Sequence, residues 1–123
     1  MVFDTSALMT PSRDGIDVFD EAERLLGGCE ALVPDAVFRE LENLTEEGND
    51  NASVALELVE NEGCAIVETD ESHGDNAVVE VATDDEGRSA VATNDAKLKE
   101  RLLKLNVPVL YPRQRNRLEV AYP

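Results

Sequence analysis

Apolar residues along this chain occur in two patterns, short uninterrupted runs and longer stretches with helical spacing. The short runs have the length and character of buried strands, and they occupy residues 1–3, 31–33, 64–67, 89–92 and 107–111. Between the runs, apolar residues recur every three or four positions, as in helices packed on a core. This spacing predicts helices over roughly 15–27, 34–47, 54–63, 75–83 and 96–105. The segment 7–14, which contains Pro11, reads as a loop or short turn.

The alternation of strands with helices predicts parallel strand pairing, right-handed crossovers and helices on both faces of one sheet. We therefore expect an α/β fold, a three-layer α/β/α domain with a doubly wound, mostly parallel five-stranded sheet. Pro108 indicates that the fifth strand lies at a sheet edge, and the weakly alternating tail over 113–120 is a candidate for pairing with an edge. Because no internal repeat or linker interrupts the 123 residues, they fit a single domain over 1–123.

Four acidic residues fall where such a fold places its ligands, outside the carboxyl ends of the strands at the reversal of strand order. Asp4 ends the first strand and Asp95 follows the fourth, and these two strands are expected to be neighbours at the reversal. Asp75 begins the helix that leads into the fourth strand, and Glu40 flanks the buried stripe of its own helix. Each acid also has a purely structural interpretation: Asp4, Asp75 and Asp95 as turn or helix-cap residues, and Glu40 as a side chain that reaches water. A cap and a ligand role are compatible, because a carboxylate has two oxygens.

Several carboxylates in one cleft repel one another and raise one another's pKa unless a cation lies between them. Oxygen ligands favour Mg²⁺ or Mn²⁺ over zinc or copper. One or two such ions activate water and stabilise the leaving oxygen in phosphodiester cleavage. His73 lies in an acidic loop, and we interpret it as a loop residue rather than a catalytic base.

The charge is strongly negative and unevenly distributed. Its net value of −16 comes from 27 acidic and 11 basic residues, but 42% hydrophobic residues in periodic blocks argue against a disordered acidic chain. We favour a halophilic protein, whose acidic surface stays hydrated at high salt, over an acidic protein of an ordinary cell. Residues 96–123 instead carry a net positive charge, with seven basic and two acidic residues. This basic end is either a contact for a polyanion or a solvated helix face followed by a polar tail.

Cys29 and Cys64 lack the paired spacing of a zinc site, so we expect buried thiols in a reducing compartment rather than a disulfide. No apolar stretch approaches the roughly 18 residues of a membrane span, and residues 1–10 lack the features of a signal peptide. The expected location is the cytoplasm.

Four segments, taken in order, resemble the PIN domain, the family also named after the PilT N-terminus. They are Val-Phe-Asp-Thr-Ser at 2–6, Val-Pro-Asp-Ala-Val-Phe-Arg-Glu-Leu at 33–41, Gly-Asp-Asn-Ala-Val at 74–78 and Ala-Thr-Asn-Asp-Ala-Lys-Leu-Lys at 92–99. The resemblance implies a metal-dependent ribonuclease in which the catalytic acids also hold Mg²⁺ or Mn²⁺, namely Asp4, Glu40, Asp75 and Asp95. Thr5, Ser6 and Thr93 would support these acids by hydrogen bonds. Asn76 stands where relatives often have a second acid, so a secondary metal site is expected to be weaker.

The chain from Thr93 to residue 115 is similar to the archaeal branch of the family that is related to small-subunit rRNA-processing endonucleases. VapC-like toxins share the acids but usually less of this ending. The resemblance implies RNA as a partner, guided by Lys97, Lys99, Arg101, Arg113, Arg115 and Arg117. Other implied partners are an antitoxin protein, a pre-ribosomal particle and a second copy of the chain.

Three readings therefore compete with an rRNA-processing endoribonuclease. One is a VapC-like toxin of a toxin–antitoxin pair, and another is a non-catalytic RNA- or protein-binding scaffold of ribosome assembly. The third is a phosphoacceptor receiver domain, which has similar length, topology and clustered acids. Receiver chemistry needs a Lys after the fifth strand, but no Lys follows Lys104, so we disfavour it.

Overall fold

A mixed sheet of six strands forms the centre of the structure, a computed structural model that describes residues 1–28, 30–84, 89–114 and 116–123. The strand order is β3-β2-β1-β4-β5-β6, with β6 antiparallel to β5 and the other pairs parallel. The strands are β1 (Val2–Phe3), β2 (Leu32–Pro34), β3 (Ala65–Val67), β4 (Val91–Ala92), β5 (Val109–Gln114) and β6 (Arg117–Ala121). The predicted α/β fold with a doubly wound, mostly parallel sheet is confirmed. The sheet has six strands rather than the five expected, because the tail forms β6.

The strand order reverses at β1, which lies between β2 and β4. Val2 faces Leu32 on one side and Val91 on the other, and all three are apolar because both faces of a central parallel strand are buried. The predicted pairing of the first and fourth strands is therefore confirmed. It brings the carboxyl ends of β1 and β4, and the residues that follow them, to the same edge of the sheet.

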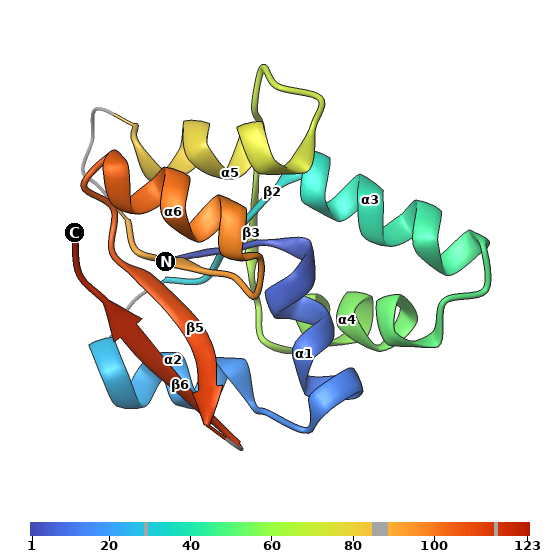
Figure 1. Ribbon diagram of the computed structural model, residues 1–123. Helices are drawn as coiled ribbons and strands as arrows, with labels where there is room; N and C mark the ends of the chain where they lie inside the picture. The colour runs from blue at the N-terminus through green and yellow to red at the C-terminus, as the bar shows by residue number, and fades with distance from the viewer. Residues whose placement is uncertain (29, 85–88, 115) are drawn as a thin grey trace.

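Six helices connect the strands in the described part of the chain (Figure 1). They are α1 (Thr5–Asp14), α2 (Val18–Leu26), α3 (Asp35–Glu46), α4 (Asp50–Asn61), α5 (Gly74–Ala82) and α6 (Ala96–Lys104). Helix α3 packs against both α4 and α5, α1 packs against α4, and α2 packs against β6. No helix of the described residues is long and apolar enough to cross a membrane.

The expected loop at 7–14 was wrong, because these residues belong to helix α1. Asp4 caps this helix by accepting a hydrogen bond from the Ala7 N–H at 2.8 Å. Leu8 and Thr10 are fully buried, and the Thr10 hydroxyl is satisfied by the Ser6 carbonyl at 2.8 Å. Capping and burial therefore outweigh the poor helix propensity of Pro11 within the helix.

The predicted position of the fifth strand at a sheet edge was also wrong. Strand β5 lies between β4 and β6, and Pro108 precedes it, where its carbonyl accepts a hydrogen bond from the Val91 N–H. A proline just before a strand removes no donor from the ladder. The tail instead supplies the edge: Val120 pairs with Leu110, as expected for a segment that alternates polar and apolar residues.

The predicted free thiol can be followed at one of the two cysteines. Cys64 is a free, half-buried cysteine, and burial raises the pKa of its thiol to about 11. This thiol is therefore protonated at neutral pH. Cys29 lies outside the described residues.

Candidate active site

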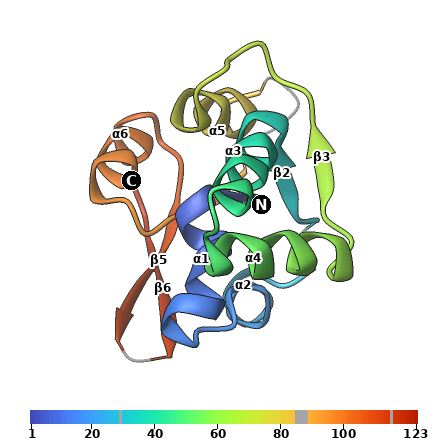
Figure 2. The same ribbon diagram turned by 90° about the vertical axis from the view of Figure 1, so that its right-hand side faces the viewer.

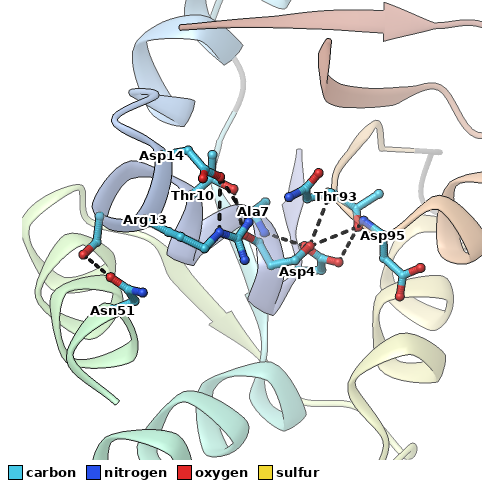
Figure 3. A network of polar contacts seen from close by, with 11 residues as sticks. Asp4, Ala7, Thr10, Arg13, Asp14, Asn51, Thr93 and Asp95 are labelled. Carbon is cyan, nitrogen blue, oxygen red and sulfur yellow. Dashed lines mark hydrogen bonds and ion pairs between the residues drawn. The ribbon is translucent and has the colours of Figure 1, made fainter. Parts of the chain in front are cut away.

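Asp4 is the most enclosed acid of the predicted site. It follows β1, and only 5% of its surface is exposed. Its Oδ1 accepts hydrogen bonds from the Ser6 hydroxyl and the Ala7 N–H, each at 2.8 Å, and its Oδ2 accepts one from the Thr93 hydroxyl (Figure 3). Burial raises the pKa of Asp4 to about 6 against the opposing effect of these donors, and the negative charge of Asp75 adds to the increase. Hydrogen bonds thus fix the Asp4 carboxyl group in a buried environment, which makes its ionised form unfavourable.

Thr93 joins Asp4 to Asp95. The Thr93 side chain is buried; its hydroxyl donates to Asp4 and accepts a hydrogen bond from the Asp95 N–H at 3.0 Å. Ser6 closes the arrangement, since its Oγ accepts from the Asn94 N–H at 2.9 Å and lies 3.4 Å from Thr93 Oγ1. Two sets of hydrogen bonds, one through Thr93 and one through Ser6, therefore connect the residues after β1 with those after β4.

Asp95 is the N-cap of α6, as its cap interpretation predicted. Its Oδ1 accepts hydrogen bonds from the Lys97 N–H at 2.9 Å and the Leu98 N–H at 3.3 Å. These cap bonds use one oxygen, so Oδ2 can face a ligand. Asp95 is half-buried and less enclosed than Asp4.

Glu40 and Asp75 form a more open part of the site. The Glu40 side chain is exposed, and its Oε2 accepts a hydrogen bond from the Thr5 hydroxyl at 2.7 Å. Gly74 begins α5 beside it, so closely that a Cβ at Gly74 would lie 2.9 Å from Glu40 Oε2. The absence of a side chain at this position allows the start of α5, and with it Asp75, to approach Glu40.

The interpretation of Asp75 as a helix cap was wrong. His73 occupies the N-cap position of α5 without a side-chain cap bond, and Asp75 lies in the first helical turn. An acid in that turn interacts favourably with the helix dipole. Its negative charge also contributes to the raised pKa of Asp4.

The donor set fits a hard divalent cation by its chemistry. All four predicted ligands are carboxylates, and the repulsion between Asp4 and Asp75 is the kind that a bound cation relieves. Among the described residues, however, no three His, Cys, Asp or Glu side chains are grouped closely enough to hold a metal ion. The exposed carboxylates of Glu40 and Asp75 would have to turn toward Asp4 for the four to share an ion.

A groove of about 830 Å³ runs between α3 and the start of α5, beside the open part of the site. Glu40 and Asp75 both line it, as does His73. Two arginines also line it, Arg39 from α3 and Arg101 from α6. Arg39 was absent from the predicted site, although its position next to Glu40 in the sequence was an available signal.

The predicted RNA-binding residues divide into two groups. Lys97, Lys99 and Arg101 belong to α6; the Lys99 ammonium lies 3.4 Å from the ring centroid of Tyr111, a cation–π contact. Arg113 and Arg117 belong to the β5–β6 hairpin, whose strands run away from α5 in both views (Figures 1 and 2). Tyr111 connects the two groups, because its ring contacts Lys99 and its hydroxyl accepts a hydrogen bond from Arg113 Nη1 at 3.4 Å. Arg115 lies outside the described residues.

The hairpin arginines have contacts within the fold. Arg113 Nε lies 3.7 Å from Glu119 Oε2 on the neighbouring strand. Helix α2 holds the hairpin through Glu21, which accepts a hydrogen bond from the Leu118 N–H at 3.0 Å. Hydrogen bonds from Arg24, with a smaller effect of the nearby Arg117, lower the pKa of Glu21 to about 2. The hairpin therefore has a structural role independent of RNA.

Comparisons with known proteins agree with this geometry. The sequence model described as "PIN like domain" matches residues 1–115. Ribonuclease VapC4 of Methanocaldococcus jannaschii is 30% identical over 125 residues, which cover 98% of this chain and 95% of that protein. The solved structure of the PIN domain endonuclease Utp24 superposes with a TM-score of 0.81 at 25% identity, covering 98% of this chain and 91% of that one.

Proposed function

The chain belongs to the PIN-like domain family, and from this premise we propose that it is a divalent-metal-dependent endoribonuclease that acts in RNA processing. The observation that carries the proposal is the buried Asp4, fixed by three hydrogen bonds at the reversal of strand order and close to the charge of Asp75. A buried acid with a raised pKa next to a second acid is typical of a functional site. The names of the two relatives, a ribonuclease and an endonuclease, support the same activity.

In this proposal Asp4, Glu40, Asp75 and Asp95 hold Mg²⁺ or Mn²⁺. A bound divalent cation supplies the Lewis acid that polarises a phosphoryl oxygen and lowers the pKa of water. The chain's own residues fix the ligands: Ser6, Thr93 and the Ala7 N–H set the orientation of Asp4, and Thr5 holds Glu40. The groove beside Glu40 and Asp75 is where we place the RNA strand.

The decisive experiment is incubation of the purified protein with structured RNA and Mn²⁺. We expect internal cleavage that EDTA abolishes and that Asp4→Asn reduces by at least about a thousandfold, since it removes the charge of the central ligand. Asp14→Asn is the matched control, because Asp14 is an exposed acid at the far end of α1. Cleavage that survives Asp4→Asn would refute the proposal. RNA binding without cleavage by the wild-type protein would instead favour the scaffold interpretation.

The second candidate is a VapC-like toxin, which the similarity to VapC4 over nearly the whole chain supports. It differs from the processing enzyme in its regulation and target rather than in its chemistry. A toxin arrests growth when it is expressed alone and is neutralised by a small protein encoded by the neighbouring gene. Expression without growth arrest, together with defined cuts in precursor rRNA, would exclude the toxin role.

A further inference from the structure

Asn76 and Arg101 form a contact in the lining of the groove described above. Arg101 projects from α6 and Asn76 from the first turn of α5, and Arg101 Nη1 donates a hydrogen bond to Asn76 Oδ1 at 2.8 Å. Both residues line the groove together with Asp75. Figure 1 shows α5 and α6 next to each other, with α3 beside the start of α5. The contact therefore holds a guanidinium close to the proposed catalytic acids.

The two arginines of the groove differ in their partners. Arg39 Nη1 lies 3.5 Å from Asp35 Oδ2, one helical turn earlier. Asp35 is itself fixed, because the Thr69 hydroxyl donates to it at 2.7 Å and lowers the pKa of the carboxyl. Arg101 has a neutral amide as its partner, and it takes part in no ion pair within 4.0 Å among the described residues. Asn76 thus positions Arg101 without cancelling its charge.

This uncancelled charge matters because the groove is acidic. Its lining has four carboxylates, from Glu40, Glu42, Glu46 and Asp75, against the two guanidinium groups. A phosphate would be repelled along most of the groove, and Arg39 is already paired. Arg101 is consequently the lining group best suited to attract a phosphate.

We propose that Arg101 binds a phosphate of the RNA strand next to the cleavage site, and that Asn76 is the positioning residue that keeps this guanidinium in place without pairing it to a carboxylate. The proposal rests on the ribonuclease function proposed above and names the residues that place its substrate. It also gives Asn76 a role other than that of a weakened metal ligand. An acid at position 76 would pair with Arg101 and withdraw its charge from the substrate.

The test compares Arg101→Gln, Asn76→Asp and Asn76→Ala with Lys104→Gln, which removes a charge from the same helix outside the groove. Steady-state cleavage of a single-stranded RNA oligonucleotide is measured with saturating Mn²⁺ at several salt concentrations. For Arg101→Gln we expect KM to rise about tenfold with kcat nearly unchanged, because the variant loses one charge-assisted hydrogen bond to the RNA. The slope of log(kcat/KM) against log[salt] should decrease by about 0.7, the value for one phosphate contact to a single strand.

Asn76→Asp separates the proposal from the metal-ligand interpretation. We expect it to raise KM although Arg101 is still present, whereas Asn76→Ala, which loses only the positioning, should raise KM less. A second series for Asn76→Asp varies the Mn²⁺ concentration. A lower Mn²⁺ requirement or a higher kcat for this variant would overturn the proposal, as would an unchanged KM and salt slope for Arg101→Gln. Because the hydrogen bond between Asn76 and Arg101 is exposed to solvent, all variants should keep the thermal unfolding midpoint of the wild type. If the wild type cleaves RNA and the variants have its KM and salt slope, this inference fails but the proposed function stands. If the wild type does not cleave RNA, the proposed function fails as well.

Discussion

The acids of this site lie in two regions that the fold treats differently. The central region, around Asp4 and Thr93, is buried and each polar group has specific partners. The outer region, around Glu40 and Asp75, is exposed, and the Glu40 carboxylate accepts a hydrogen bond from the Thr5 hydroxyl. The central region is therefore built during folding, whereas the outer region is left free to adjust to its ligands. Substitutions in the two regions should separate stability from activity.

The largest expected effect comes from the charge of Asp4. In the folded protein Asp4 keeps its proton up to about pH 6, whereas in the unfolded chain it loses it near 3.8, so the native state binds more protons between these values. The free energy of unfolding should therefore fall as the pH rises from 4 to 7, by at most about 3 kcal/mol from this group. Urea titrations at each pH would measure it as the difference between the wild type and Asp4→Asn.

The acids that do not interact with Asp4 affect both proteins in that comparison equally, so the difference reports on Asp4 and its interaction with Asp75. Saturating Mn²⁺ should restore part of the lost stability to the wild type and little to Asp4→Asn, because a ligand that binds the native state stabilises it. If the difference in the free energy of unfolding between the wild type and Asp4→Asn does not change with pH, ionisation of the buried Asp4 carboxyl does not destabilise the native state.

Thr93→Val should have the next largest effect on stability. It removes the hydroxyl that donates to Asp4 and accepts from the Asp95 N–H, while the volume stays similar. We expect a loss of about 2 kcal/mol in the free energy of unfolding, because partners buried beside the site lose their hydrogen bonds. Thr5→Val is the matched control in the outer region, with an expected loss below about 0.5 kcal/mol at its exposed bond. Equal losses in the free energy of unfolding for Thr93→Val and Thr5→Val would contradict the proposed difference between the central and outer regions.

Gly74→Ala should act in the opposite way, on activity with little effect on stability. The new Cβ would approach Glu40 Oε2 to 2.9 Å, and the end of that flexible side chain can move away at small cost. An alanine at the start of a helix also lowers the entropy of the unfolded chain, so stability should be unchanged or raised by up to about 1 kcal/mol. Cleavage should fall about tenfold because Glu40 is displaced. Unfolding curves and cleavage rates of one preparation would test both parts.

The central region was largely predictable from the sequence. Asp4 and Asp95 each follow a short apolar run, and the topology of alternating strands and helices places such runs side by side. Neighbouring residues in the sequence indicate the caps and the strands. The doubly wound topology then predicts that the first and fourth strands pair. Helix α1 was missed because its stability comes from the burial of Leu8 and Thr10 rather than from helix propensity.

The outer region was less predictable because its contacts depend on how the helices pack, which the order of the strands does not determine. The hydrogen bond between Asn76 and Arg101 spans 25 positions, and that between Thr5 and Glu40 spans 35. Neither pair shares a local pattern that a reading of the chain detects. The close approach of Gly74 to Glu40 depends on the packing of α5 against α3, which is likewise a tertiary property.

The bond between Thr93 and Asp4 also has a consequence for the timing of assembly. It joins positions 89 apart, so it cannot form during synthesis until β4 has left the ribosome. Contacts of such long range form late in folding, after the local helices. A nascent chain that ends before residue 93 has Asp4 but lacks both its buried donor and Asp95. We therefore expect the site to stay inactive until the segment from β4 onward has been synthesised and has docked on the rest of the fold.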